Sequence, residues 1–423
     1  MSFYVKSLFF AVPSFFILIL IEAIIAKKRG IVINNSADMI SSLSSGLTNA
    51  LRDGLKLSIA IVSYSWLVDS TSIYSIDISM PSILIGFIVL DFSGYWVHRL
   101  THRVNILWNR HIIHHSSEEF NLSCALRQSI SNTLKFSAVF MVPAALIGVP
   151  ASIFAVIGPI HLFMQFWYHT RLIDKMGWLE QIIVTPSHHR VHHAINPEYI
   201  DKNYGQILII WDKLFGSFQS ELKNITPVYG VLRPVNSWNP VIINYKHLWQ
   251  LIKDAYHTKN TWDKIRIWFM PTGWRPDDVS ILFPLNTINN PYKQKKYKTP
   301  ASYPFIIWSF IQLNFSTILM LHFFNVIHIQ NQISNYIYGG FILYHIFSFT
   351  ANLDGKKYST GTEVLKLFFI LCLLYNQNFL WFGLDILYSY LIIIYSITSI
   401  CITFYFSKNF PTDDNYFILG NNG

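Results

Sequence analysis

Long apolar runs constrain the fold of this chain more than any other feature of its sequence. The runs cover residues 9–26, 82–97, 136–168, 304–323, 336–351 and 364–406. An α-helix needs about 20 predominantly apolar residues to cross a bilayer, and several of these runs approach or exceed that length. Only 13% of the residues are charged, against about 25% in soluble proteins. The sequence therefore predicts an all-α, multi-pass membrane helical bundle.

The distribution of Lys and Arg predicts how these helices are oriented. The Lys-Lys-Arg segment 27–29 follows the first run and is expected in the cytoplasm, because cytoplasmic loops are enriched in basic residues. No small-residue cleavage pattern follows that run, which is therefore expected to be an anchor. A second helix containing Arg52 and Lys56 is expected to run to about Val68, which places the loop 69–81 outside.

The run 136–168 is too long for one crossing and short for two. Gly148, Val149 and Pro150 near its middle favour a turn, so we expect a helical hairpin that returns to the cytoplasmic side. The predicted organisation is N-terminal membrane helices in 1–80, a catalytic region with the hairpin in 81–220, a cytoplasmic segment in 221–300 and C-terminal membrane helices in 301–423.

Cysteine content and net charge exclude several classes of protein. Cys124, Cys372 and Cys401 are widely spaced, which indicates neither a disulfide framework nor a cysteine metal site. The net charge of +9 is explained by basic cytoplasmic loops. We therefore expect no nucleic-acid partner.

Histidines gather in one part of the chain. Eleven of the 16 lie between His98 and His193, and eight of these form clusters at helical i+3 and i+4 spacing. These eight are His98, His102, His111, His114, His115, His189, His192 and His193. Neutral imidazole is the commonest metal ligand in proteins, and eight exceed the four to six that one metal takes. The pattern predicts two metals at the cytoplasmic surface, with iron, zinc and copper all compatible with imidazole.

The remaining histidines differ in what their positions indicate. His169 follows the hairpin and is placed to be a ninth metal ligand. His188 is either a further ligand or a hydrogen-bond partner of one. His161, His322 and His345 lie inside apolar runs and are expected to be hydrogen-bonded core residues.

One carboxylate lies on the same helical stripe as the first two clustered histidines. Asp91, Tyr95, His98 and His102 are spaced at i, i+4, i+7 and i+11, on one helix face. Ionisable residues inside membrane helices are rare and usually functional. Because metal-bound histidines commonly donate to a carboxylate, we expect Asp91 to support the metal site.

The histidine spacing resembles the signature of the fatty acid hydroxylase/sterol desaturase superfamily, whose members are membrane di-iron oxygenases. The segments "DFSGYWVHRLTH", "NLSCALRQS" and "TPSHHRVHH" are more similar still to the branch that cleaves glycerol ether lipids. This resemblance is strong over about residues 91–219 and weakens after them. One position departs from it, because Arg103 stands where relatives in that branch carry an acidic residue.

The resemblance implies a cofactor set, a reaction and a location. Two iron ions at the histidines would activate O2, with tetrahydrobiopterin as reductant. The lipid carbon next to the ether oxygen would be hydroxylated, giving a hemiacetal that breaks down to a fatty aldehyde and a glycerol derivative. Glu118, which follows the second cluster, is expected either to contact the pterin as a catalytic residue or to cap a helix. The host membrane would be the endoplasmic reticulum in a eukaryote and the inner membrane in a bacterium.

Two alternatives remain open from the sequence. The chain could be another hydroxylase or desaturase of the superfamily, acting on sterols, fatty acids or carotenoids with a protein electron donor. It could also be a metal transporter, although transporters place their sites near the bilayer midplane, whereas these clusters lie at helix ends. Metal content would separate the transporter from the oxygenases.

Overall fold

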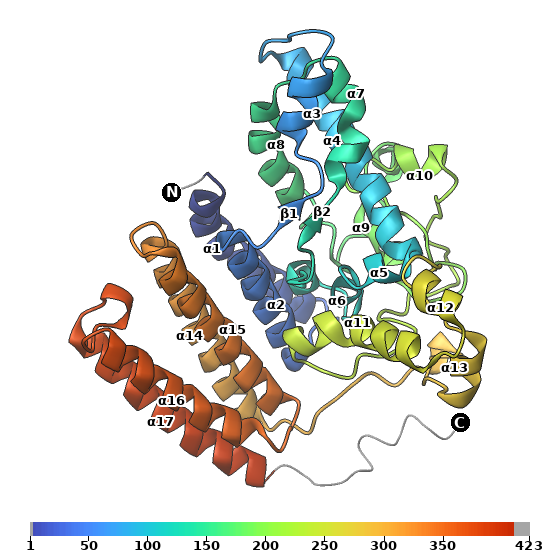
Figure 1. Cartoon of the computed structure of the whole chain (residues 1–423). Coiled ribbons are helices and arrows are strands. Elements are labelled where there is room, and N and C mark those ends of the chain that lie inside the picture. Colours follow the sequence, from blue (N-terminus) through green and yellow to red (C-terminus); the bar gives the residue numbers. More distant parts are fainter. Residues whose placement is uncertain (1–2, 410–423) are drawn as a thin grey trace.

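The computed structural model describes residues 3–409, and nearly all of its regular structure is helical (Figure 1). The α-helices are α1 (Phe3–Lys28), α2 (Ser36–Gly54), α3 (Tyr64–Thr71), α4 (Met80–Arg103), α5 (Asn105–Trp108), α6 (Ile112–His115), α7 (Val142–Leu146), α8 (Ala151–Phe163), α9 (Pro186–His192), α10 (Ile210–Leu214), α11 (Pro240–His257), α12 (Thr261–Arg266), α13 (Asp277–Leu282), α14 (Tyr303–Val326), α15 (Gln332–Leu353), α16 (Ser359–Asn376) and α17 (Ile386–Lys408). Short 3₁₀ helices cover Leu122–Leu126, Ser137–Met141, Gly177–Gln181, Pro291–Lys293 and Trp381–Gly383. A parallel pair of two-residue strands, β1 (Ile59–Ala60) and β2 (Leu134–Lys135), lies near the centre of the molecule.

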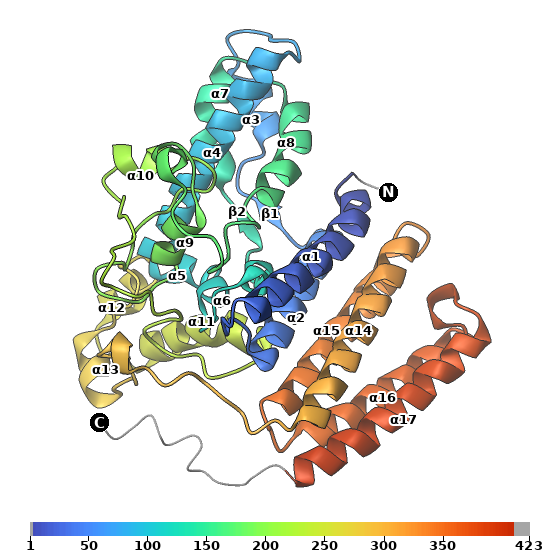
Figure 2. The ribbon, with the colours of Figure 1, turned by 180° about the vertical axis from the view of Figure 1, so that it is seen from behind.

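Four helices in the described part of the chain are long and apolar enough to cross a membrane. They are Phe10–Lys28, Met80–Arg103, Tyr303–Val326 and Ile386–Lys408. The prediction of an all-α, multi-pass membrane bundle is therefore confirmed. The C-terminal helices α14–α17 form one side of the molecule, and α1 and α2 separate them from the histidine-bearing region (Figures 1 and 2).

The expected second membrane helix is wrong. Helix α2 ends at Gly54 instead of continuing to about Val68, because Lys56 adopts a left-handed conformation with φ of 56°. The chain then enters β1, and α3 begins afresh after the Ser63 side chain, which accepts a hydrogen bond from the Trp66 backbone N–H. Helix α2 is not among the four candidate membrane spans, and most of its residues between Ala37 and Ser45 are buried.

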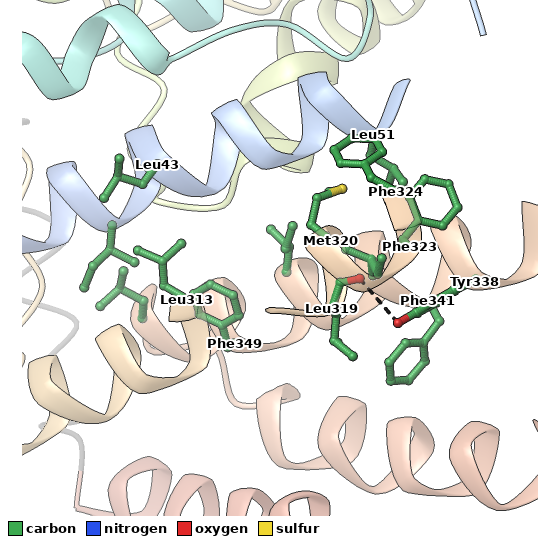
Figure 3. Packing of buried hydrophobic residues seen from close by; sticks show 14 of the residues in the cluster. Leu43, Leu51, Leu313, Leu319, Met320, Phe323, Phe324, Tyr338, Phe341 and Phe349 are labelled. Carbon is green, nitrogen blue, oxygen red and sulfur yellow. Dashed lines mark hydrogen bonds between the residues drawn. The ribbon is translucent and has the colours of Figure 1, made fainter. Parts of the chain in front are cut away.

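Helix α2 packs one face against the C-terminal helices (Figure 3). Leu51 of α2 lies near Met320 and Phe324 of α14, and Leu43 lies nearer Leu313, all in one buried apolar cluster. A Cβ atom at Gly54 would lie 2.6 Å from the Phe324 ring, so the end of α2 must stay small to approach α14. This contact fixes α2 between the C-terminal bundle and the site.

The histidine-bearing region is built on α4 and the hairpin beside it. Helices α7 and α8 are separated by Gly148, whose φ is +80°, and a Cβ there would lie 1.9 Å from the Tyr74 carbonyl oxygen. Only glycine satisfies both the left-handed conformation and the close approach. Helix α8 returns along α4, where Ile153 contacts the position of Gly86. The hairpin therefore delivers the segment after α8 back to the end of α4.

Candidate metal centre

Three short helical segments converge on the centre of the molecule (Figure 2). Helix α4 ends at Arg103, so His98 and His102 occupy the same face of its last turns. Helix α6 is a single turn, with His111 at its N-terminal end. Helix α9 begins with Pro186, a favoured residue in a first helical turn. These segments direct their imidazoles into one buried space.

The nine histidines predicted as metal ligands come together in two groups. One group contains His98, His102, His111, His115 and His192, and the other contains His114, His169, His189 and His193. Within each group, one ring nitrogen per residue lies within 4.8 Å of the others. The predicted ligands therefore form two adjacent candidate sites, as a two-metal centre requires.

Membership of the groups follows helical geometry and not sequence adjacency. His114 and His115 are neighbours in the chain but belong to different groups, as do His192 and His193. Consecutive helical residues point about 100° apart because 3.6 residues make one turn, whereas residues at i and i+4 share a face. Helices α6 and α9 therefore each contribute to both sites, whereas α4 contributes only to the first.

Backbone carbonyls fix the orientation of four of these imidazoles. The Nδ1 atoms of His98, His114, His169 and His192 lie 2.8–3.2 Å from the carbonyl oxygens of Tyr204, Arg127, Gln165 and Lys202. A carbonyl oxygen only accepts, so each Nδ1 carries the hydrogen and each Nε2 carries a lone pair. Such outer hydrogen bonds set the tautomer of metal-binding histidines.

The inward Nε2 atoms fit a bound cation. Those of His114 and His169 lie 3.4 Å apart, although the carbonyl contacts give both of them lone pairs. Two lone pairs directed at one another repel unless a cation lies between them. The Nε2 atoms of His98 and His111 are 2.9 Å apart, and two ligands about 2.1 Å from a common metal are separated by about 3 Å. Metal ligation satisfies this arrangement.

Burial keeps these imidazoles in the metal-binding form. Burial and the proximity of His169 lower the pKa of His114 to about 3, and burial lowers the pKa of His169 to about 3. The same cause lowers the pKa of His111 and His193. At neutral pH these rings are uncharged, and neutral imidazole is the form that ligates metals.

His188 is outside both groups in the described structure. Its Nδ1 lies 3.4 Å from the backbone nitrogen of Thr185 at the start of α9. Burial lowers the pKa of His188 to about 4. His188 therefore helps to define the beginning of the helix that carries His189.

Asp91 does not accept a hydrogen bond from any of the nine histidines, contrary to the expectation from the helical stripe. Its carboxylate accepts from the backbone N–H groups of Ile207 and Leu208, from the Trp211 indole and from His161 Nε2, at 2.8–3.0 Å. The first three contacts hold the loop that follows Tyr204, and the Tyr204 carbonyl orients His98. Asp91 therefore supports the site indirectly, through the backbone.

The carboxylate that lies beside the histidines is Asp201, which the sequence analysis did not predict. Asp201 lies 3.7 Å from His102 Nδ1 and pairs with Arg103 at 2.9 Å. This ion pair balances the positive charge that Arg103 brings to the edge of the centre. Asp201 comes from a loop remote in sequence, and no motif around it indicates the contact.

Glu118 anchors another segment. Its two oxygens accept from the Gln294 side chain at 3.1 Å and from the Tyr297 backbone N–H. Burial raises the pKa of Glu118 to about 7. Because both oxygens are used within the chain, the geometry favours an anchoring role over contact with a bound pterin.

Asp91→Asn is expected to lower metal content and turnover by about 10–100-fold, the usual effect of losing a partner outside the ligands. The amide would direct N–H groups at donors of the loop, so His98 would lose its fixed carbonyl. Metal analysis and turnover of the purified variant test this result. Asp69→Asn, an exposed position, is the control, and unchanged metal and turnover in Asp91→Asn would limit the carboxylate to packing.

A cavity of about 710 Å³ opens onto both groups of histidines. His98 and His111 line it from one group, and His114, His169 and His189 line it from the other. Its apolar wall is formed by Phe15, Phe16, Leu162, Phe163, Met320 and Phe324, which lie on α1, α8 and α14. Another part of the cavity wall is polar and includes Asn49, Gln128 and Ser129. The cavity is therefore amphipathic, with the histidines exposed along it.

Comparison with known sequences identifies the class of protein to which this histidine-rich site belongs. The fatty acid hydroxylase family model matches residues 83–217, a range that contains all nine histidines. No solved structure matches the chain.

Comparison with individual curated proteins indicates the family within this class. Alkylglycerol monooxygenase from Xenopus tropicalis is 32% identical over 92% of this chain and 85% of that protein. The enzyme from Danio rerio is 34% identical over 86% of this chain and 81% of that protein. The human enzyme is 38% identical, with the match covering 64% of this chain and 60% of that protein. The chain belongs to the alkylglycerol monooxygenase family, within the fatty acid hydroxylases.

Proposed function

We propose that this chain is a membrane monooxygenase that cleaves the ether bond of alkylglycerol lipids. The observation that carries the proposal is the convergence of nine neutral imidazoles, in two groups, on a cavity with an apolar wall. Family membership supports the substrate class, because the relatives that match most of the chain are named for alkylglycerol.

In this proposal each group of histidines holds one iron ion. Imidazole suits iron, and bound iron supplies the activation of O2, which zinc, having no redox chemistry, does not. One oxygen atom enters the C–H bond next to the ether oxygen. The other would leave as water, with two electrons from the reductant and two protons. The hemiacetal then divides into a fatty aldehyde and a glycerol derivative.

Residues of this chain position the lipid and exclude water. The apolar wall from α1, α8 and α14 accommodates an alkyl chain that enters from the bilayer. His161 lines the same cavity, and its Nε2 donates to Asp91 at 2.8 Å. This pairing leaves Nδ1 as an acceptor near the Gln165 amide, at 3.3 Å. Both ring nitrogens of His161 are therefore used within the protein, and the residue orients Asp91 and Gln165 beside the cavity.

Tetrahydrobiopterin is the proposed reductant, on the basis of the resemblance in the histidine region. The Arg103–Asp201 ion pair reduces the effect of the charge reversal at Arg103 on an approaching pterin. The proposed location is the endoplasmic reticulum in a eukaryotic host or the inner membrane in a bacterial one.

An assay with defined lipids and reductants tests the proposal. Membranes containing the protein are expected to convert 1-O-alkylglycerol to fatty aldehyde, with a requirement for both O2 and tetrahydrobiopterin. Sterol and acyl-lipid substrates, with ferredoxin or cytochrome donors, form the second arm. Turnover supported only by a protein donor, on a lipid without an ether, would favour the hydroxylase or desaturase alternative. Zinc alone in the purified protein, with no lipid oxidised, would contradict an oxygenase.

A further inference from the structure

The cavity that reaches the histidines also has a cationic wall. Arg52 near the end of α2, Arg110 between α5 and α6, and Lys135 in β2 all line it. These residues come from three separate segments of the chain. Nothing in the proposed cleavage of an uncharged alkylglycerol requires three cations beside the substrate.

The Arg52 and Arg110 side chains are held by one segment, residues 129–136, which also carries Lys135. Arg52 donates to the Ser129 carbonyl oxygen, and Arg110 donates to that of Leu134 at 3.0 Å. The Arg110 guanidinium also lies over the Phe136 ring, 5.0 Å from its centroid. Lys135 is fixed through its backbone, because its carbonyl oxygen accepts from the Ile61 N–H at 2.8 Å across the strand pair. These contacts fix the positions of the cations along the cavity wall.

Positive charge on this wall is only partly balanced. Asp53 also lines the cavity and is paired with Arg52 at 2.6 Å. Neither Arg110 nor Lys135 forms an ion pair with a carboxylate in the described part of the chain. Three cations minus one anion leave a formal charge of +2 on this wall. Arg110 and Lys135 are half-buried, and Asp53 is the one carboxylate beside them among the described residues, so an anionic ligand would stabilise the wall.

Burial and mutual repulsion act on the two unpaired cations. Burial, followed by the nearby Arg52, lowers the pKa of Lys135 to about 8 and that of Arg110 to about 10. Both residues still carry charge at neutral pH. A bound anion would relieve their repulsion.

We propose that Arg52, Arg110 and Lys135 bind the phosphate of an anionic head group, so that this chain prefers phosphate-bearing ether lipids to uncharged alkylglycerols. The inference rests on the proposed function and deepens it. The alkyl chain lies along α1, α8 and α14, the ether carbon lies at the histidines, and the head group lies at the cationic wall. A phosphate monoester carries a charge of about −1.5 to −2 at neutral pH, which matches the wall, and Arg and Lys both bind phosphate.

Kinetics with two matched substrates test the inference. The iron-loaded, full-length protein is assayed with 1-O-alkylglycerol and with its 3-phosphate, both carrying the same chain. We expect kcat/KM to be about 10–100-fold higher for the phosphate, in line with charge-assisted hydrogen bonds. Arg110→Gln and Lys135→Gln should each remove most of that preference through KM, while turnover of the uncharged lipid changes less than about 2-fold.

Two further variants separate a charge effect from misfolding. Arg110→Lys keeps the charge and should retain part of the preference. Lys253→Gln, an exposed position on α11, should retain all of it. Equal kcat/KM for the two substrates in the wild type, or equal losses for both in Arg110→Gln, would overturn the inference while leaving ether cleavage intact.

Binding without turnover distinguishes failure of the inference from failure of the function. A thioether analogue of the phosphate lipid should bind the wild type about 10-fold more tightly than it binds Lys135→Gln, as expected for a lost charge-assisted contact. Charge-dependent binding without oxidation of any ether lipid would refute the reaction and leave the phosphate site standing. Displacement of the analogue by inorganic phosphate alone would show that the wall takes free phosphate, and the lipid assignment would be wrong.

Discussion

Replacing His111 or His169 by alanine is expected to remove one bound iron ion from each chain and to abolish lipid oxidation. The two residues belong to different groups, so each variant should retain about one of the two irons proposed for the wild type, because binding requires a complete set of deprotonated ligands. Turnover should fall by more than the 10–100-fold associated with partners outside the ligands. Metal analysis of the purified protein, alongside the aldehyde assay, measures both effects.

Two other histidines provide controls for this experiment. His188→Ala changes the residue next to His189 and should retain both irons, because His188 bonds to Thr185 and lies outside both groups. His257→Ala changes an exposed residue at the end of α11 and should behave as the wild type. Full iron in His111→Ala or His169→Ala would contradict the assignment of the two groups, as would equal iron loss in His257→Ala.

The histidines could be predicted from the sequence because their spacing is local. Pairs at i and i+4 share a helix face wherever the helix lies in the fold, so the local clustering of the eight patterned histidines follows from the sequence alone. How the residues divide between two sites does not follow from the motifs. His114 and His115 point in different directions because consecutive helical residues lie about 100° apart, but which histidines complete each site depends on contacts remote in sequence.

The contacts of the carboxylates near the site could not be predicted from the pattern of a single helix. Asp91 lies on the predicted stripe, yet its oxygens are used by the 207–211 loop and His161. Asp201 lies beside His102 because a loop with a left-handed residue places it there. A helical stripe predicts which residues share a face, and it does not predict which loop covers that face.

The composition of α2 is also explained only by the fold. Asp38 and four of its serines are buried in the structure, on the side that faces residues 117–129. Ser45 donates to the Gln128 carbonyl oxygen at 2.6 Å, while Leu43 and Leu51 on the same helix pack into the C-terminal bundle. Helix α2 is therefore amphipathic and not uniformly apolar, with leucines toward the C-terminal bundle and polar side chains toward residues 117–129.

Asp38→Ala is expected to destabilise the protein by about 3–5 kcal/mol, the usual effect of removing one partner of a buried ion pair. Asp38 and Arg127 pair at 3.1 Å, with 3% and 1% of their side chains exposed. Without Asp38, Arg127 would keep its hydrogen bonds to Ser42 and Ser116 but would carry a buried charge without a counter-ion.

The same substitution should also weaken the metal centre, because the Arg127 carbonyl oxygen accepts from His114 Nδ1 at 3.2 Å. Thermal unfolding in detergent and iron content should therefore fall together. Arg266→Ala breaks a more exposed pair with Asp263 and should change stability by less than about 1 kcal/mol. If Asp38→Ala unfolds at the wild-type temperature with both irons bound, α2 does not stabilise the centre through this pair. If the variant is destabilised but keeps both irons, the position of His114 is set by the other residues around the cavity and not by Arg127.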